Sequence, residues 1–302
     1  RGGDVNLSAR SILITNGAGI ITGTDKVGQG GNLTVNAQES VEIIGTSNDA
    51  NLSLSMLSTA TAGTEAAGDL TIHTKRLIVR DGGVVSASTA GAGDGGNLIV
   101  NASEFIELNG TAPDGFPSGF STDTISSGNA GDLIIERGRL IVRDGAAVSV
   151  STFADGESGN LIIRDSESIE LSGTSRAGFP SGLYAQAFGD GDAGNLTINH
   201  TQNLSVRDGA KITVAAGNAV DNRIPTGRLD RAKTDEIADI IGAPDISISP
   251  QATGNAGNIQ ITADNIFLEN QGLIIAETES TEGGNITLNV NDILLLRHNS
   301  SI

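Results

Sequence analysis

Three glutamates of this 302-residue chain stand at nearly regular intervals: Glu42, Glu107 and Glu170 are 65 and 63 residues apart. Each lies in a short segment in which polar and apolar residues alternate. Two carboxyl groups that flank a glycosidic bond can perform glycoside hydrolysis. Regular recurrence among apolar neighbours, however, is typical of the solvated face of a strand. The glutamates therefore favour a structural row over a catalytic pair.

Two aspartates in a glycine-rich loop offer oxygen ligands for a cation. Asp190 and Asp192 lie in the segment Gly-Asp-Gly-Asp-Ala-Gly at 189–194, and carboxylates suit calcium. The nine-residue repeat that calcium-binding β-rolls require does not continue from this loop. The sequence indicates no cofactor, with calcium held by Asp190 and Asp192 as the one candidate.

The usual catalytic constellations are not assembled by this sequence. His73, His200 and His298 are not grouped with an acidic pair, and the chain has no Cys. No phosphate-binding loop with its Lys is present, and no Ser stands in a Gly-x-Ser-x-Gly elbow. We therefore assign no catalytic residue and do not expect an enzyme.

Aromatic or basic side chains at two places are candidates for partner contact. The pentapeptide Gly-Phe-Pro-Ser-Gly occurs twice, 63 residues apart, and places Phe116 and Phe179 at equivalent points. Each ring either packs over an apolar edge of the fold or contacts a sugar or a protein. Arg228 and Arg231 lie in the only charged, helix-compatible run of the chain, at 226–241. These four residues are the candidate partner-binding side chains.

A repeat sets the spacing of these residues. The phrase Gly-[Asn/Asp]-apolar-x-apolar begins nine times, at residues 3, 31, 68, 96, 131, 159, 194, 257 and 284. Short and long intervals alternate, so that the larger unit is about 63 residues. A fixed period of this kind predicts stacked coils, each of which buries its apolar face against its neighbours.

Each coil contains three short apolar segments with the alternation of strand residues. In the coil that begins at Gly68, they are 70–72, 77–79 and 84–88, with a turn that contains Asp and Gly before the third. Three short strands in 28–35 residues predict an all-β fold, a single-stranded parallel β-helix over residues 1–302. The Asn or Asp after each glycine is expected to form a ladder at one corner and to satisfy turn backbone groups.

One stretch interrupts the repeat. Between Gly194 and Gly257, 63 residues hold one coil start where two are expected. Apolar residues of the run 226–241 can share one helical face. Residues 218–250 are therefore predicted to be an inserted loop with a short helix, and such loops often carry function.

Composition limits the partners. The net charge of −18 repels phosphate backbones, which argues against nucleic-acid binding. Aromatic residues supply only 3% of the chain, which suits a narrow aliphatic core. No apolar run is long enough to span a membrane as a helix. Because the chain begins without Met and stops inside a repeat, we expect a segment of a longer protein.

The repeated strands, the phrase Leu-Ile-Val-Arg-Asp-Gly, the Gly-Phe-Pro-Ser-Gly loops and the closing residues 283–302 together resemble the filamentous-haemagglutinin-like exoproteins of cyanobacteria. The resemblance covers almost the whole chain except about 218–250. It implies a right-handed β-helix exported by two-partner secretion. It also implies, as a partner, an outer-membrane barrel transporter that recognises an amino-terminal domain absent from this sequence. The implied location is the cell surface or the exterior.

The expected function is the structural stalk of a secreted or cell-surface adhesin, acting in adhesion, aggregation or surface-layer assembly. Glycans or cell-surface proteins are the expected contacts of its loops. The alternative is a polysaccharide lyase or hydrolase built on a β-helix, which needs converging carboxylates on one face. A phage fibre shares the architecture and would be marked by obligate trimerisation.

Overall fold

The computed structural model describes residues 1–24, 28–48, 52–217, 253–278 and 282–302. Over these ranges the chain is all-β, and every pairing between named strands is parallel. The prediction of an all-β fold with parallel strands is confirmed. The expected insertion at 218–250, with Arg228 and Arg231, lies outside the described residues. Within the described ranges there is no helix long and apolar enough to cross a membrane.

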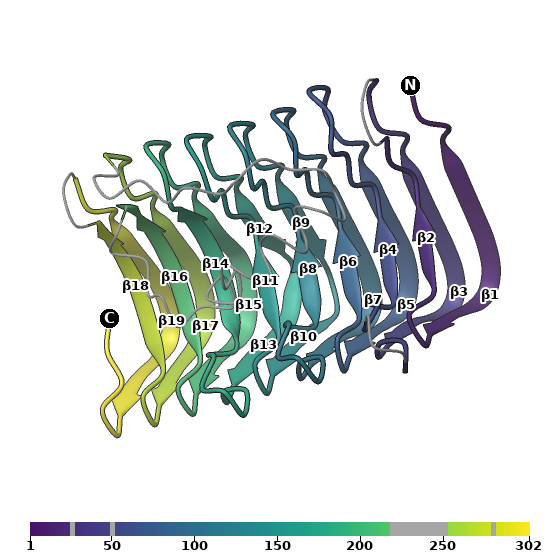
Figure 1. Ribbon diagram of the computed structural model, residues 1–302. Helices are drawn as coiled ribbons and strands as arrows, with labels where there is room; N and C mark the ends of the chain where they lie inside the picture. The colour runs from purple at the N-terminus through teal and green to yellow at the C-terminus, as the bar shows by residue number, and fades with distance from the viewer. Residues whose placement is uncertain (25–27, 49–51, 218–252, 279–281) are drawn as a thin grey trace.

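The strands form two sheets, and the coils stack in chain order (Figure 1). Sheet A contains eleven strands: β1 (Val5–Thr15), β3 (Leu33–Ile44), β5 (Leu70–Arg80), β7 (Leu98–Asn109), β9 (Leu133–Glu136), β10 (Arg139–Arg143), β12 (Leu161–Arg164), β13 (Ser166–Ser172), β15 (Leu196–Arg207), β17 (Ile259–Glu269) and β19 (Ile286–Arg297). Sheet B contains eight: β2 (Gly19–Ile21), β4 (Met56–Ser58), β6 (Val84–Ser86), β8 (Gly119–Ser121), β11 (Ala147–Ser149), β14 (Gly182–Ala187), β16 (Lys211–Ala216) and β18 (Leu273–Thr278).

Each coil contributes to sheet A and then crosses to sheet B. The sheet A strands begin two residues after each of the nine glycines of the repeated phrase. Equivalent residues pair from coil to coil, as Leu33 with Leu70 and Leu70 with Leu98. The sequence repeat is therefore the pairing register of the sheet.

The first two apolar segments of a coil belong to one sheet, which corrects the expectation of three separate strands in every coil. In most coils they form one strand of 11 or 12 residues with a register shift in the middle, as between Thr74 and Arg76. Only the coils that begin at Gly131 and Gly159 have a break between them. There Arg137, Gly138 and Asp165 have positive φ, which ends a strand.

The core is a narrow aliphatic column between the sheets. One side-chain row in sheet A is fully buried through seven coils: Leu33, Leu70, Leu98, Leu133, Leu161, Leu196 and Ile259. Burying each such side chain contributes about 1.5–3 kcal/mol. Rows of small aliphatic residues fill this space without large aromatics, as the composition predicts.

The glycine of the repeated phrase is required by close packing between coils. A Cβ built on Gly68, Gly96 or Gly131 would lie 2.0 Å from the carbonyl oxygen of the equivalent glycine one coil earlier. None of these three glycines has a positive φ. The contact distance between backbones, and not the freedom of φ, therefore selects glycine at this corner.

Candidate functional site

The predicted corner ladder is confirmed. The side-chain oxygen of each Asn or Asp after the glycine accepts a hydrogen bond from the backbone N–H of its equivalent one coil later. For example, Asn97 N donates to Asp69 Oδ1 at 2.9 Å and Asp132 N donates to Asn97 Oδ1 at 3.0 Å. The corner ladder consists of Asp4, Asn32, Asp69, Asn97, Asp132, Asn160, Asn195, Asn258 and Asn285.

Asp190 and Asp192, the candidate calcium ligands, bond to the coil that follows them. Asp190 Oδ1 accepts from Thr253 N at 3.1 Å, and Asp192 Oδ1 accepts from Asn255 N at 2.7 Å and from Asn255 Nδ2 at 3.1 Å. In the described part of the chain no group of three or more His, Cys, Asp or Glu side chains could hold a metal ion. These aspartates stabilise coil stacking, and their calcium role stays a prediction.

The glutamate row lies on the outer face of sheet A and is paired with arginines. Glu107 and Glu170 each form an ion pair with an arginine of the next coil, Arg143 and Arg207. The arginines precede the Asp-Gly turns that lead towards sheet B. The two spacings are nearly the same, 36 and 37 residues. This recurrence is the sequence signal that could have revealed the pairs.

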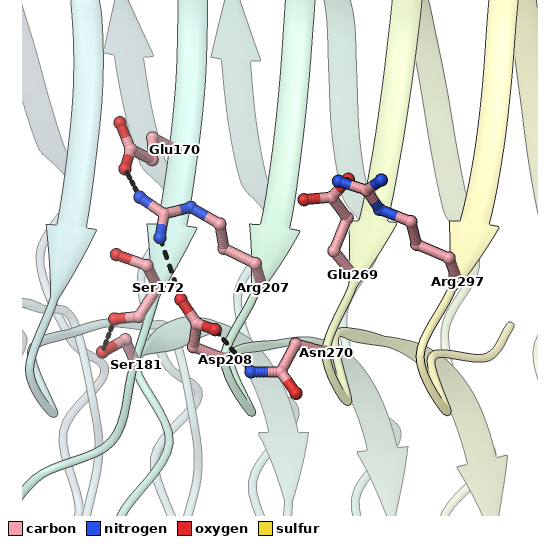
Figure 2. Close-up of polar contacts among 8 residues, drawn as sticks. All are labelled: Glu170, Ser172, Ser181, Arg207, Asp208, Glu269, Asn270 and Arg297. Carbon is pink, nitrogen blue, oxygen red and sulfur yellow. Dashed lines mark hydrogen bonds and ion pairs between the residues drawn. The ribbon is translucent and has the colours of Figure 1, made fainter.

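Arg207 joins three coils at the edge of this face (Figure 2). Its guanidinium donates to Glu170 of the preceding coil and, at 2.8 Å, to Asp208 of its own turn. Asn270 of the next coil donates to Asp208 at 2.6 Å. The hydrogen bond to Glu170 raises the pKa of the Arg207 guanidinium above its ordinary value, so the pair stays charged throughout the physiological pH range.

Carboxylates held by guanidinium groups have no free proton to give and no free charge to take one. Glu170 and Arg207 are 41% and 40% exposed, so solvent screens their attraction and the pair contributes at most about 1 kcal/mol. Glu269 and Arg297 repeat the arrangement two coils later (Figure 2). The row can order the outer face of sheet A, and no second carboxyl group converges on it as hydrolysis requires.

Phe116 and Phe179 occupy equivalent half-buried positions in two outer loops. The functional element of each loop is the serine that follows Phe-Pro, which the sequence repeats without revealing its partner. Ser118 Oγ and Ser181 Oγ are fully buried and accept hydrogen bonds from Gly82 N and Gly145 N, both at 2.9 Å. Each serine thus caps the Asp-Gly turn of the preceding short coil.

This capping explains the alternation of short and long coils. The turn residues Asp144 and Gly145 both have positive φ, at 57° and 90°. Such a turn leaves a buried N–H group that needs an acceptor. The extra residues of the following long coil bring Ser181 to it. The 63-residue unit is therefore a turn in one coil and its cap in the next.

A second polar network lies on the outer face of sheet B. It contains Ser86, Ser88, Ser121, Asp123, Ser149 and Ser151, and we name it the seryl network. Burial raises the pKa of the Asp123 carboxyl group above its ordinary value, against hydrogen bonds from Ser149, Ser151 and Ser121 that lower it. The signal in the sequence is the pattern Ser-x-Ser or Ser-x-Asp in successive third segments.

Comparisons of this chain with protein-family models, with curated proteins and with solved structures find no match. The class of protein therefore has to be argued from the arrangement of its own residues.

Proposed function

We propose that the chain is the structural stalk of a secreted or cell-surface adhesin. The observation that carries this proposal is the continuous coil-to-coil pairing of sheet A from β1 to β19. Each coil adds about 4.8 Å, so nine coils make a rod segment of about 40 Å. Such a scaffold grows by repetition and can hold a distal contact away from a surface.

The proposed architecture is a single-stranded right-handed parallel β-helix, as in the filamentous-haemagglutinin-like exoproteins that the repeats resemble. Two features support a mechanical role. The corner ladder and the capped turns fix each coil on its neighbour through hydrogen bonds. The acidic groups of the glutamate row are paired and not convergent. Both features serve rigidity.

The proposed route to the surface is two-partner secretion through an outer-membrane barrel transporter. The absence of Cys suits a chain that crosses a membrane unfolded and folds without disulfides. Coils that contact only their neighbours can fold one after another as the chain emerges. Phe116 and Phe179, half-buried on outer loops, are the proposed points of contact with glycans or surface proteins.

Gene deletion in the source organism tests the proposal. Cells without the gene should adhere to surfaces and aggregate less than the parent strain, and the full-length gene should restore both. A matched strain that carries Phe116→Ser and Phe179→Ser asks whether these loops make the contact. Unchanged adhesion, aggregation and surface layer in the deletion strain would overturn the stalk proposal.

A further inference from the structure

The seryl network runs without a break across three coils of sheet B. Ser86 Oγ and Ser88 Oγ are 2.7 Å apart, Ser88 Oγ and Ser121 Oγ are 2.9 Å apart, and Ser121 Oγ donates to Asp123 Oδ2 at 2.8 Å. From the other side, Ser149 Oγ donates to Asp123 Oδ1 at 2.7 Å.

The carboxylate fixes the direction of every proton in the network. Ionised Asp123 can only accept, so Ser121 and Ser149 both spend their single proton on it. Ser88 must then donate to Ser121, since Ser121 has no second proton. By the same argument Ser151 donates to Ser149, whose Oγ lies 2.9 Å away. All hydroxyl protons therefore point towards Asp123.

What remains at the surface are acceptor sites. Asp123 uses three of about four lone-pair sites, on Ser121 Oγ, Ser149 Oγ and the N–H of Ser151. Ser88 Oγ and Ser149 Oγ each keep one lone pair by the same count. No ion pair joins Asp123 to a basic side chain in the ranges that the structure describes. Its charge is thus poorly solvated and has no counter-ion.

A second observation lies in the same outward row. Thr152 N donates to Gln186 O, which places Gln186 beside Ser151 on the next coil. The Gln186 side chain is fully buried, and neither its Nε2 nor its Oε1 has a hydrogen-bond partner. An unpaired buried amide costs about 1–3 kcal/mol. A native fold keeps such a group where a ligand completes it.

We propose that this face of sheet B is a docking site for a lysine-bearing peptide of a partner protein, with the lysine ammonium group on Asp123. An ammonium group has three donors, and Asp123, Ser88 and Ser149 offer three acceptor oxygens on successive coils. A planar guanidinium fork fits three separate strands less well. A calcium ion requires six to eight oxygens, of which one carboxylate supplies too few.

The amide of Gln186 favours a peptide as the remainder of the ligand. A side-chain amide offers one acceptor and two donors and so complements a backbone peptide group. The acidic surface, with a net charge of −18, attracts a basic partner from a distance. This site does not depend on the proposed stalk role and would stand if that role were refuted.

The test is an NMR titration of the purified full chain with the peptide acetyl-Gly-Lys-Gly-amide. The amides of residues 121–123 and 149–151 should shift, and Asp123→Asn should weaken the affinity about tenfold or more because it removes a poorly solvated charge. Glu104→Gln removes one charge from the outer face of sheet A and should change the affinity less than twofold. Ser149→Ala provides a second variant within the network and should also weaken binding.

The competing ligands decide the chemistry. A glutamine peptide of the same length should not bind, and the arginine peptide should bind more weakly. Equal losses in Asp123→Asn and Glu104→Gln would mean general attraction to an acidic surface and would overturn the site. Tighter binding of a glucosamine oligomer than of the lysine peptide would overturn the peptide assignment.

Discussion

Gly131→Ala should destabilise the stack at one defined interface. A Cβ at residue 131 would lie 2.0 Å from Gly96 O, although real Cβ atoms essentially never come closer than 3.0 Å to another heavy atom. The opposing atom belongs to the backbone, so it cannot rotate away, and one coil must retreat by about 1 Å. Overpacking of a core typically costs about 1–3 kcal/mol. With a rigid backbone on both sides we expect a cost of about 3 kcal/mol.

The same substitution at the first coil is the matched control. Gly3 begins the same phrase, but nothing lies within 4 Å of a Cβ built on it. Gly3→Ala should be neutral or stabilise by about 0.4–1 kcal/mol, because alanine restricts the unfolded chain. The difference between the two variants isolates the contact between coils from the intrinsic effect of alanine.

Hydrogen exchange is the suitable assay, because stacked repeats can open locally and a single melting temperature averages over them. A loss of about 3 kcal/mol corresponds to about 100-fold faster exchange. We expect this in β7 and β9, which flank the contact, with less effect in β1 and β19. Exchange in β7 and β9 of Gly131→Ala that equals that of the wild type would refute the steric account of the repeated glycine.

Three further predictions concern buried polar groups. Ser181→Ala should cost about 1–3 kcal/mol because it leaves Gly145 N without its acceptor; an unchanged urea midpoint would contradict the capping role. Gln186→Leu should raise the melting temperature, since it removes an unpaired buried amide; a lower value would show that the amide is satisfied. Asp123→Asn should gain most over the wild type at neutral pH, where Asp123 is ionised. This gain should shrink as the pH falls through the raised folded pKa towards the ordinary value of 3.8, because protonation then favours the folded wild type; a pH-independent difference would contradict the burial of the carboxyl group.

The coil register and the corner ladder could be predicted because one short phrase contains all of their determinants. The glycine spacing is the number of residues per coil, and the next residue carries the ladder side chain. Coil stacking then places equivalent residues beside each other without further information. The Asp-Gly turns are predictable for the same reason, as Asp144 with its positive φ of 57° illustrates.

Contacts between different positions of neighbouring coils could not be predicted in this way. Ser181 caps a turn that lies 36 residues earlier, and Arg207 reaches a glutamate 37 residues earlier. Neither offset is a coil length, so the sequence repeat alone does not indicate these partners. The steric role of Gly131 was also hidden, because a glycine in a turn and a glycine under a carbonyl group look alike in a sequence.

The continuity of sheet A depended on a small local difference. Between the first two apolar segments, one extra residue produces only a register shift, as at Thr74 in β5. The Arg137-Gly138 pair, with positive φ at both residues, breaks the strand instead. Both cases read as a polar interruption in the sequence, which is why three separate strands were expected in every coil.

Antibody labelling of intact cells tests the central claim most directly. Antibodies raised against the purified chain should bind unpermeabilised cells of the source organism, and immunogold particles should lie outside the outer membrane. Brief treatment with an external protease should remove the signal, while a cytoplasmic control protein stays intact. Labelling that requires permeabilisation and lies in the cytoplasm would contradict a secreted or cell-surface stalk.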